Sequence, residues 1–284
     1  MTYSLLTIDG KVIDAMPQIL VEAFNVQLSE TDVSPSSELE SRNWDALVTC
    51  EYEAVAGDLA WSLLVYAARE VEQHPTEEEL AVLLSQRLEA PVFFAWGDDL
   101  PWIRKVALPG GEFTLARVTE SDDERSSFAV EAAESIIPGF PTLPVTHFPE
   151  IVRALAIPTP VTDAAVKSMS GRGDGKLRGL LVNWERLSSR MRSGWPPAGW
   201  YSPTMYQEDL ELRDLLAADV AHLGTRANSE ITDCLSRLDA QYRDVTVDDR
   251  GRTLANALGH EKPDLVDRPW YWQRRPDPLP WTPQ

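Results

Sequence analysis

Two glutamates in one strand-like segment are the residues whose spacing points most directly to a binding surface. Residues 46–54 alternate apolar and polar side chains, so Glu51 and Glu53 are expected on one face of a β-strand. An antiparallel sheet with one solvated face shows such residues routinely. The alternative is an acidic docking face for a basic protein, which is extended by the acids of residues 70–79, namely Glu70, Glu72, Glu77 and Glu78.

A second set of residues suited to recognition closes the chain. Tryptophan and arginine are favoured in interface hot spots, and the last residues include Trp270, Trp272, Arg274 and Trp281. The simpler interpretation is that this proline-rich tail folds back onto a helical domain, because exposed tryptophans would form an adhesive apolar patch. We expect packing and keep docking on a neighbouring molecule as the alternative.

The sequence contains no complete motif for nucleotide binding and no motif for nucleophilic catalysis. The glycine-rich run Ser170–Lys176 differs from a phosphate-binding P-loop, because leucine follows the lysine where Ser or Thr is needed. A flexible linker is the better interpretation of that run. The sequence also lacks a G-x-S-x-G nucleophile elbow. We therefore expect no cofactor and assign no catalytic residue.

Metal binding is not expected either. The four histidines have no paired spacing, and Cys50 and Cys234 lie far apart, so the cysteines are predicted to be buried, reduced thiols. The acid clusters Asp98–Asp99 and Asp122–Glu124 do not fit an EF-hand loop and predict solvated turns.

The net charge of the chain is concentrated in its first half. Residues 1–150 contain 27 acidic and 8 basic residues, a net charge of −19, whereas residues 151–284 contain 18 of each. With 43% hydrophobic residues the chain can form a real core and is not a disordered acidic protein. The acidic balance argues against nucleic acids and anionic membranes as partners and favours basic proteins.

Targeting and membrane signals are not expected in this sequence. The N-terminal residues lack the basic and apolar regions of a signal peptide, and no apolar run approaches the ~20 residues needed to cross a bilayer. A cytoplasmic protein is the expectation.

The first half is predicted to mix helices and strands. Strands are expected near 3–9, 46–54, 91–96 and 128–137, with a hairpin at 103–118. Helices are expected near 17–24, 59–71 and 76–88, the last introduced by a Thr76/Glu79 capping box, and residues 29–43 are expected to form a loop.

The second half is predicted to be helical. The expected helices lie near 177–191, 204–223, 231–242 and 252–258. The predicted class is therefore α+β, with an acidic domain over 1–152 that contains an antiparallel or mixed sheet. A linker over 153–175 and an all-α domain over 176–284 with an aromatic, proline-rich tail complete the prediction.

Parts of the sequence resemble known groups of proteins. The run Arg42–Glu51, the stretch Phe148–Arg153 and the ending Arg274–Trp281 look like those of uncharacterised two-part proteins of high-GC actinobacteria, which implies no activity. The acidic α+β first half is similar in composition and element order to immunity proteins of bacterial toxin systems. That resemblance implies a small acidic protein that blocks a basic toxin domain, and it carries over no individual residue.

Three functions follow from these patterns. The leading hypothesis is a non-enzymatic protein that binds a basic partner through the first domain, as an immunity-type inhibitor does. One alternative is an enzyme with its site between the domains, where Glu51 and Glu53 would meet Arg178 or Arg186. The other is a scaffold or oligomer whose aromatic tail docks on a neighbour. None of the three calls for a cofactor, nucleic acid or membrane.

Overall fold

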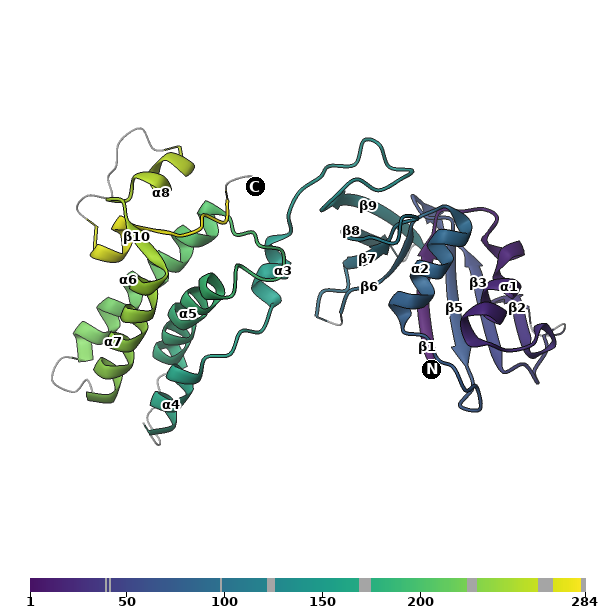
Figure 1. The fold of residues 1–284 in the computed structure, drawn as a ribbon, viewed down its shortest axis with the longest axis horizontal. Coiled ribbons are helices and arrows are strands. Elements are labelled where there is room, and N and C mark those ends of the chain that lie inside the picture. The colour runs from purple at the N-terminus through teal and green to yellow at the C-terminus, as the bar shows by residue number, and fades with distance from the viewer. Residues whose placement is uncertain are drawn as a thin grey trace. The chain divides into compact units, whose positions relative to one another are not determined.

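The chain forms two compact units, Met1–Phe148 and Pro149–Gln284 (Figure 1). The structure is a computed structural model that describes residues 1–38, 40, 42–97, 99–121, 126–168, 175–223, 229–259 and 268–281. Helices and strands occur together with a large mixed sheet, so the predicted α+β class is confirmed.

The N-terminal unit is built on one mixed sheet, with strand order β2-β3-β5-β1-β6-β7-β8-β9-β4. The pairs β2/β3 and β4/β9 are parallel, and the other neighbours are antiparallel. Its elements in chain order are β1 (Thr2–Thr7), α1 (Val12–Phe24), η1 (Leu28–Glu30), β2 (Thr31–Pro35), β3 (Val48–Ala54), β4 (Ala56–Gly57), β5 (Trp61–Ala67), α2 (Glu77–Leu88), β6 (Val92–Ala95), β7 (Ile103–Ala107), β8 (Phe113–Ser121) and β9 (Ser127–Ala133).

Helices α1 and α2 cover one face of this sheet (Figure 1). Met16 and Leu20 of α1 and Leu80 of α2 share a buried cluster with Leu63 and alternate residues of the neighbouring strands. The predicted capping box begins α2: the Thr76 hydroxyl accepts a hydrogen bond from the Glu79 backbone N–H, and the Glu79 carboxylate accepts one from the Thr76 backbone N–H.

The opposite face is covered only over part of the sheet. A second cluster there joins Leu6, Phe93 and residues of β7–β9 to Leu59 and Ile137, which come from connecting segments. Close approach of β4 to β9 requires glycine at residue 57, where φ is +86° and a Cβ would lie 2.3 Å from the Phe128 carbonyl oxygen.

The C-terminal unit is mainly helical, as predicted for α5 to α8. It also contains a two-stranded antiparallel ribbon, β10 with β11, which the all-α prediction missed. Its elements are α3 (Pro149–Ala154), α4 (Pro160–Ser168), α5 (Gly175–Arg192), α6 (Pro203–Leu223), α7 (Ser229–Asp244), β10 (Thr246–Asp248), α8 (Arg252–Ala257), η3 (Trp270–Gln273) and β11 (Arg274–Pro276).

Aromatic side chains dominate the core of this unit. The Trp184 ring lies 4.4 Å from that of Tyr242 and 5.9 Å from that of Tyr271, both measured between ring centroids. Trp272 is 1% exposed and packs in the same cluster. Tyr206 and Tyr242 join their hydroxyls by a hydrogen bond at the centre.

Two predictions for the first half are wrong. Residues 61–67 form strand β5 rather than part of a helix over 59–71, because Leu63, Val65 and Ala67 alternate inward and pair with β1 and β3. The segment was predicted to be a helix because Ala60, Leu63, Leu64, Ala67 and Val71 also recur at helical spacing. The expected loop over 29–43 contains β2, whose edge position tolerates its polar residues and its terminal Pro35.

The stretch expected to be a linker, 153–175, contains helix α4. This helix contacts α5 and α7, and Val161 lies in the helical core. The glycine-rich residues 169–174 and the predicted acidic turns at Asp98 and Asp122–Glu124 lie outside the described residues.

Candidate functional site

Among the described residues, no apolar cluster covers β3 and β5 on the side opposite α1 and α2. Strand geometry places alternate residues on this side, and they are exposed because the second apolar cluster extends over β6–β9 instead. We call this surface the β3–β5 face and define it by six residues on strands β2, β3 and β5 and on the loop before β3, namely Asp32, Trp44, Glu51, Glu53, Leu64 and Tyr66.

Large apolar side chains occupy the centre of the β3–β5 face. Leu64 is 44% exposed and Tyr66 is 50% exposed, two positions apart on β5. Glu51 pairs with Leu64 across the strands, and Thr49 pairs with Tyr66. Directly opposed side chains in an antiparallel pair lie about 5 Å apart. The face therefore has an apolar centre bordered by a carboxylate.

Arg42 fixes the loop beside this face. Its guanidinium forms a 2.5 Å ion pair with Glu51 and donates to the backbone oxygens of Pro35 and Ser36. It also lies 5.7 Å from the centroid of the Trp44 ring, and Trp44 is 71% exposed. The same guanidinium thus pairs with Glu51 and lies over the exposed Trp44 ring at the rim of the face.

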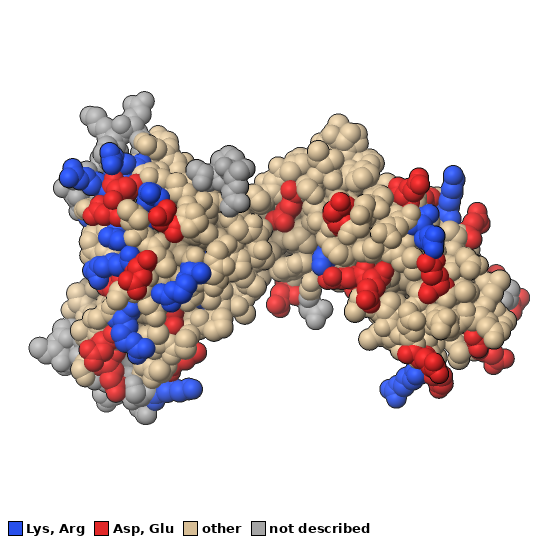
Figure 2. Space-filling model, in the orientation of Figure 1, with Lys and Arg blue, Asp and Glu red and all other residues tan. Residues whose placement is uncertain are grey.

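The β3–β5 face carries a net negative charge. Asp32, Glu51 and Glu53 contribute three negative charges, and Arg42 beside them contributes one positive charge. Glu53 is exposed and forms no ion pair with any residue that the structure describes. The whole N-terminal unit contains 26 acidic and 8 basic residues. Figure 2 shows red acidic side chains at many points on this unit, at right, and mixed charges on the C-terminal unit, at left.

The structure brings together only some of the predicted acids. Glu51 and Glu53 share the β3–β5 face, as their spacing predicts. Glu70 and Glu72 are exposed in the segment that follows β5. Glu77 and Glu78 have structural partners, because Glu77 accepts a hydrogen bond from the Ser4 backbone N–H and Glu78 pairs with Lys105 at 2.5 Å.

The aromatic tail lies mostly inside the C-terminal unit. The Trp272 indole N–H donates to the Asp214 carboxylate, and Trp281 packs against Tyr206. Trp270 is partly buried, and the central carbon of the Arg243 guanidinium lies 3.7 Å from the centroid of its ring. The fourth predicted residue, Arg274, donates to the Thr246 hydroxyl and to the backbone oxygens of Thr246 and Arg243. These contacts hold the tail in place within its own unit.

The arginines proposed for the enzyme hypothesis lie on α5. Arg178 lies 3.5 Å from Asp163, and Arg186 is exposed. Both belong to the C-terminal unit, whereas Glu51 pairs with Arg42 in the N-terminal unit.

Sequence reasoning missed the apolar centre of the β3–β5 face. Leu64 and Tyr66 fell inside the segment that helical spacing assigned to residues 59–71. The aromatic residues and the valine of 61–67 were the signal for a strand, and strand geometry would have placed Leu64 and Tyr66 on one face of it. Their position beside Glu51 comes from the pairing of β5 with β3.

A buried carboxylate in the C-terminal unit was not foreseen either. Asp209 accepts hydrogen bonds from the Tyr201 hydroxyl and from the Asn183 side-chain amide. Burial raises the pKa of Asp209 to about 6, while those hydrogen bonds and the charge of Arg190 act in the opposite direction. Asn183 of α5 and Tyr201 both donate to this carboxylate on α6, so Asp209 links these segments of the C-terminal unit.

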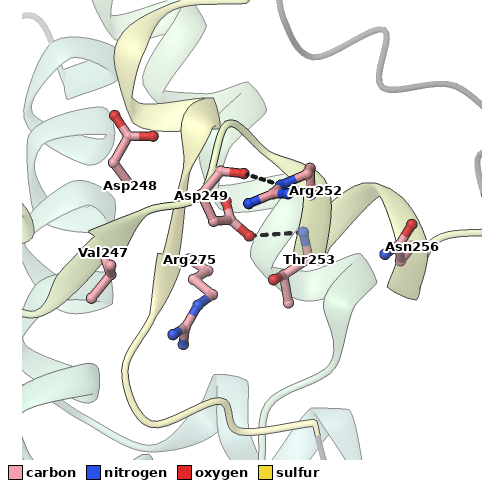
Figure 3. Close-up of a pocket in the computed structure, with 7 residues that line it drawn as sticks. All are labelled: Val247, Asp248, Asp249, Arg252, Thr253, Asn256 and Arg275. Carbon is pink, nitrogen blue, oxygen red and sulfur yellow. Dashed lines mark hydrogen bonds between the residues drawn. The ribbon is translucent and has the colours of Figure 1, made fainter.

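An open pocket of about 480 Å³ lies between β10, α8 and β11 (Figure 3). Arg275 extends from β11 into it, beside Val247 and across from Thr253. The carboxylate of Asp249 accepts hydrogen bonds from the backbone N–H groups of Gly251 and Thr253. Asp249 therefore holds the first turn of α8, and the Asp248 carboxylate accepts a hydrogen bond from the Arg250 backbone N–H.

Metal and membrane features were sought across the described residues. They contain no cluster of three or more His, Cys, Asp or Glu that could hold a metal ion. No helix among them is long and apolar enough to span a bilayer.

Cys50 and Cys234 are buried free thiols. Burial raises the pKa of both thiols, that of Cys50 to about 12.

Comparison of the chain with protein-family models, curated proteins and solved structures found no match.

Proposed function

We propose that this chain is a non-enzymatic protein-binding protein that docks a basic protein on its β3–β5 face. The observation that carries the proposal is the pair Leu64 and Tyr66, exposed side by side on an uncovered sheet and bordered by Glu51 and Glu53. An apolar centre with a charged rim is the usual organisation of a protein interface.

The aromatic residues supply the affinity in this proposal. Tyr66 and Trp44 are large, rigid side chains, and burying them against a partner removes apolar surface from water. Tyrosine and tryptophan are also the commonest hot-spot residues. The Arg42–Glu51 ion pair supports this role because it positions the Arg42 guanidinium over the Trp44 ring, a contact that favours one orientation of the ring before a partner binds.

The charges select the partner. The acidic rim and the net charge of the N-terminal unit attract a basic protein and accelerate its encounter, whereas an acidic protein is repelled. In this proposal the N-terminal unit is an acidic α+β domain and the C-terminal unit is a separate, nearly neutral helical domain. An immunity-type inhibitor of a basic toxin is the specific form of the function.

The test is a binding assay between the full-length protein and the products of genes that neighbour its own, including any basic toxin domain. We expect one basic protein to bind at low salt and to dissociate as salt rises. Tyr66→Ala should weaken that binding by at least ~30-fold, as expected for a hot spot worth ~2 kcal/mol. Glu53→Lys should slow association.

Two control variants match these changes elsewhere on the N-terminal unit. Trp102→Ala removes an aromatic side chain that is 45% exposed, and Glu120→Lys reverses an exposed acid on β8. Both should bind the partner as the parent protein does. The proposal is wrong if the bound protein is acidic, or if Tyr66→Ala and Trp102→Ala bind it equally well.

A further inference from the structure

A second open pocket lies in the C-terminal unit, along α5. It has a volume of about 490 Å³ and is formed by one side of α5 and by the chain that leads into α4. Gly175, Arg178, Gly179, Val182 and Arg186 line it from α5. Spacings of three and four residues place these positions on one face of the helix. We call this site the α5 pocket.

Two arginines make the α5 pocket positive. Arg186 forms no hydrogen bond or ion pair with any residue in the described part of the chain, and Arg178 meets only the Asp163 carboxylate there, at 3.5 Å. Two other arginines of the unit have a carboxylate at closer range, Arg213 with Asp239 at 3.1 Å and Arg153 with Glu208 at 2.5 Å. Arg192, like Arg186, has no ion pair with a described residue, but it does not line the pocket. The pocket therefore holds more positive charge than its own acid neutralises.

Gly179 provides an independent observation. It lies inside an 18-residue helix, where glycine lowers helix stability relative to alanine. A Cβ at this position would meet nothing within 4 Å, so packing does not require a glycine. Glycine leaves the helix backbone open on this side of the α5 pocket, so a ligand bound there can reach the backbone at Gly179.

We propose that the α5 pocket binds a phosphate monoester. The guanidinium groups of Arg178 and Arg186 bind the phosphate oxygens by charge-assisted hydrogen bonds, which suit the planar donor geometry of arginine. Ile157 and Val182 supply an apolar wall for the organic part of the ligand. This site lies in the C-terminal unit and does not depend on the function proposed for the β3–β5 face.

The test is calorimetric titration of the full-length protein with phenyl phosphate. We expect saturable binding at about millimolar concentration or below, and a loss of at least ~10-fold in affinity for the Arg178→Gln/Arg186→Gln double variant. Arg192→Gln is the matched control, because Arg192 is an exposed arginine on α5 that does not line the pocket. Absence of saturable binding, or an equal loss with Arg192→Gln, would overturn the proposal.

Two further variants separate ligand binding from folding. Asp163→Asn removes the acid that competes for Arg178, so it should tighten the binding of phenyl phosphate. Gly179→Ala should raise the melting temperature and weaken binding, because its methyl group fills the approach to the backbone. A Gly179→Ala variant that is more stable and binds phenyl phosphate as well as the parent would contradict the proposed position of the ligand.

Discussion

Individual acids of this chain have different roles according to what surrounds them. Asp214 accepts hydrogen bonds from the Tyr271 hydroxyl and the Trp272 indole, and Asp239 accepts them from Trp184 and Arg213. Those acids satisfy buried donors and hold aromatic side chains in place. Glu53 has no such partner among the described residues and is exposed, so its carboxylate is available for the partner that we propose.

Asp209 gives a prediction at the scale of one residue. Its pKa is raised by burial to about 6, so the folded protein retains the Asp209 proton at pH values where the unfolded chain has released it. The free energy of unfolding must therefore fall as pH rises from about 4 to 6. Asp209→Asn removes this loss, so the variant should gain up to ~3 kcal/mol relative to the parent between pH 4 and pH 8.

Urea unfolding of both proteins at pH 4 and pH 8, followed by tryptophan fluorescence, measures this difference. Asp233→Asn is the control, because Asp233 is an exposed acid on the neighbouring helix α7. A constant difference between Asp209→Asn and the parent across this pH range would show that Asp209 does not titrate as described.

At the scale of the element, helix α2 depends on its first turn. Thr76 and Glu79 satisfy backbone N–H groups that the helix itself leaves without partners. The hydrogen bonds from the backbone and side chain of Thr76 also lower the pKa of Glu79, so this contribution is lost as acid protonates the carboxylate.

Thr76→Ala should lower the free energy of unfolding by ~1 kcal/mol at neutral pH. The loss reflects the hydroxyl that accepts the Glu79 backbone N–H. Chemical denaturation measures it, with Gln73→Ala, at an exposed position in the preceding segment, as the control. An equal effect of the two substitutions would rule out a specific capping contribution.

Strand β5 shows why element type could be misassigned from the sequence. The apolar residues of 60–71 match helical spacing, whereas Leu63, Val65 and Ala67 alone match strand spacing. Pairing with both β1 and β3 makes this segment a strand, and those partners lie far away in the sequence. Helix α2 was predictable because its capping box and apolar spacing are local.

At the scale of the whole molecule, the charge asymmetry has a thermodynamic consequence. Like charges on the N-terminal unit repel one another in the folded state more strongly than in the expanded chain. Salt screens this repulsion over distances of about 10 Å at 0.1 M. The melting temperature should therefore rise by a few degrees between about 20 mM and 500 mM sodium chloride.

Differential scanning fluorimetry measures that change, and potassium chloride should give the same result, because screening does not depend on the identity of the cation. A melting temperature that falls with salt would mean that ion pairs such as Arg42–Glu51 and Arg213–Asp239 outweigh the repulsion.

The sequence by itself determined the features that depend on neighbouring residues. It predicted the α2 capping box, the hairpin of β7 and β8, helices α5 to α8 and a shared face for Glu51 and Glu53, because each is encoded within about 20 residues. Only the tertiary structure decided that β5 is a strand, that Leu64 and Tyr66 lie beside Glu51, and which residues the tryptophan-rich tail packs against, since the sequence favoured packing without giving its partners. Those outcomes depend on contacts between distant segments, which local periodicity does not encode.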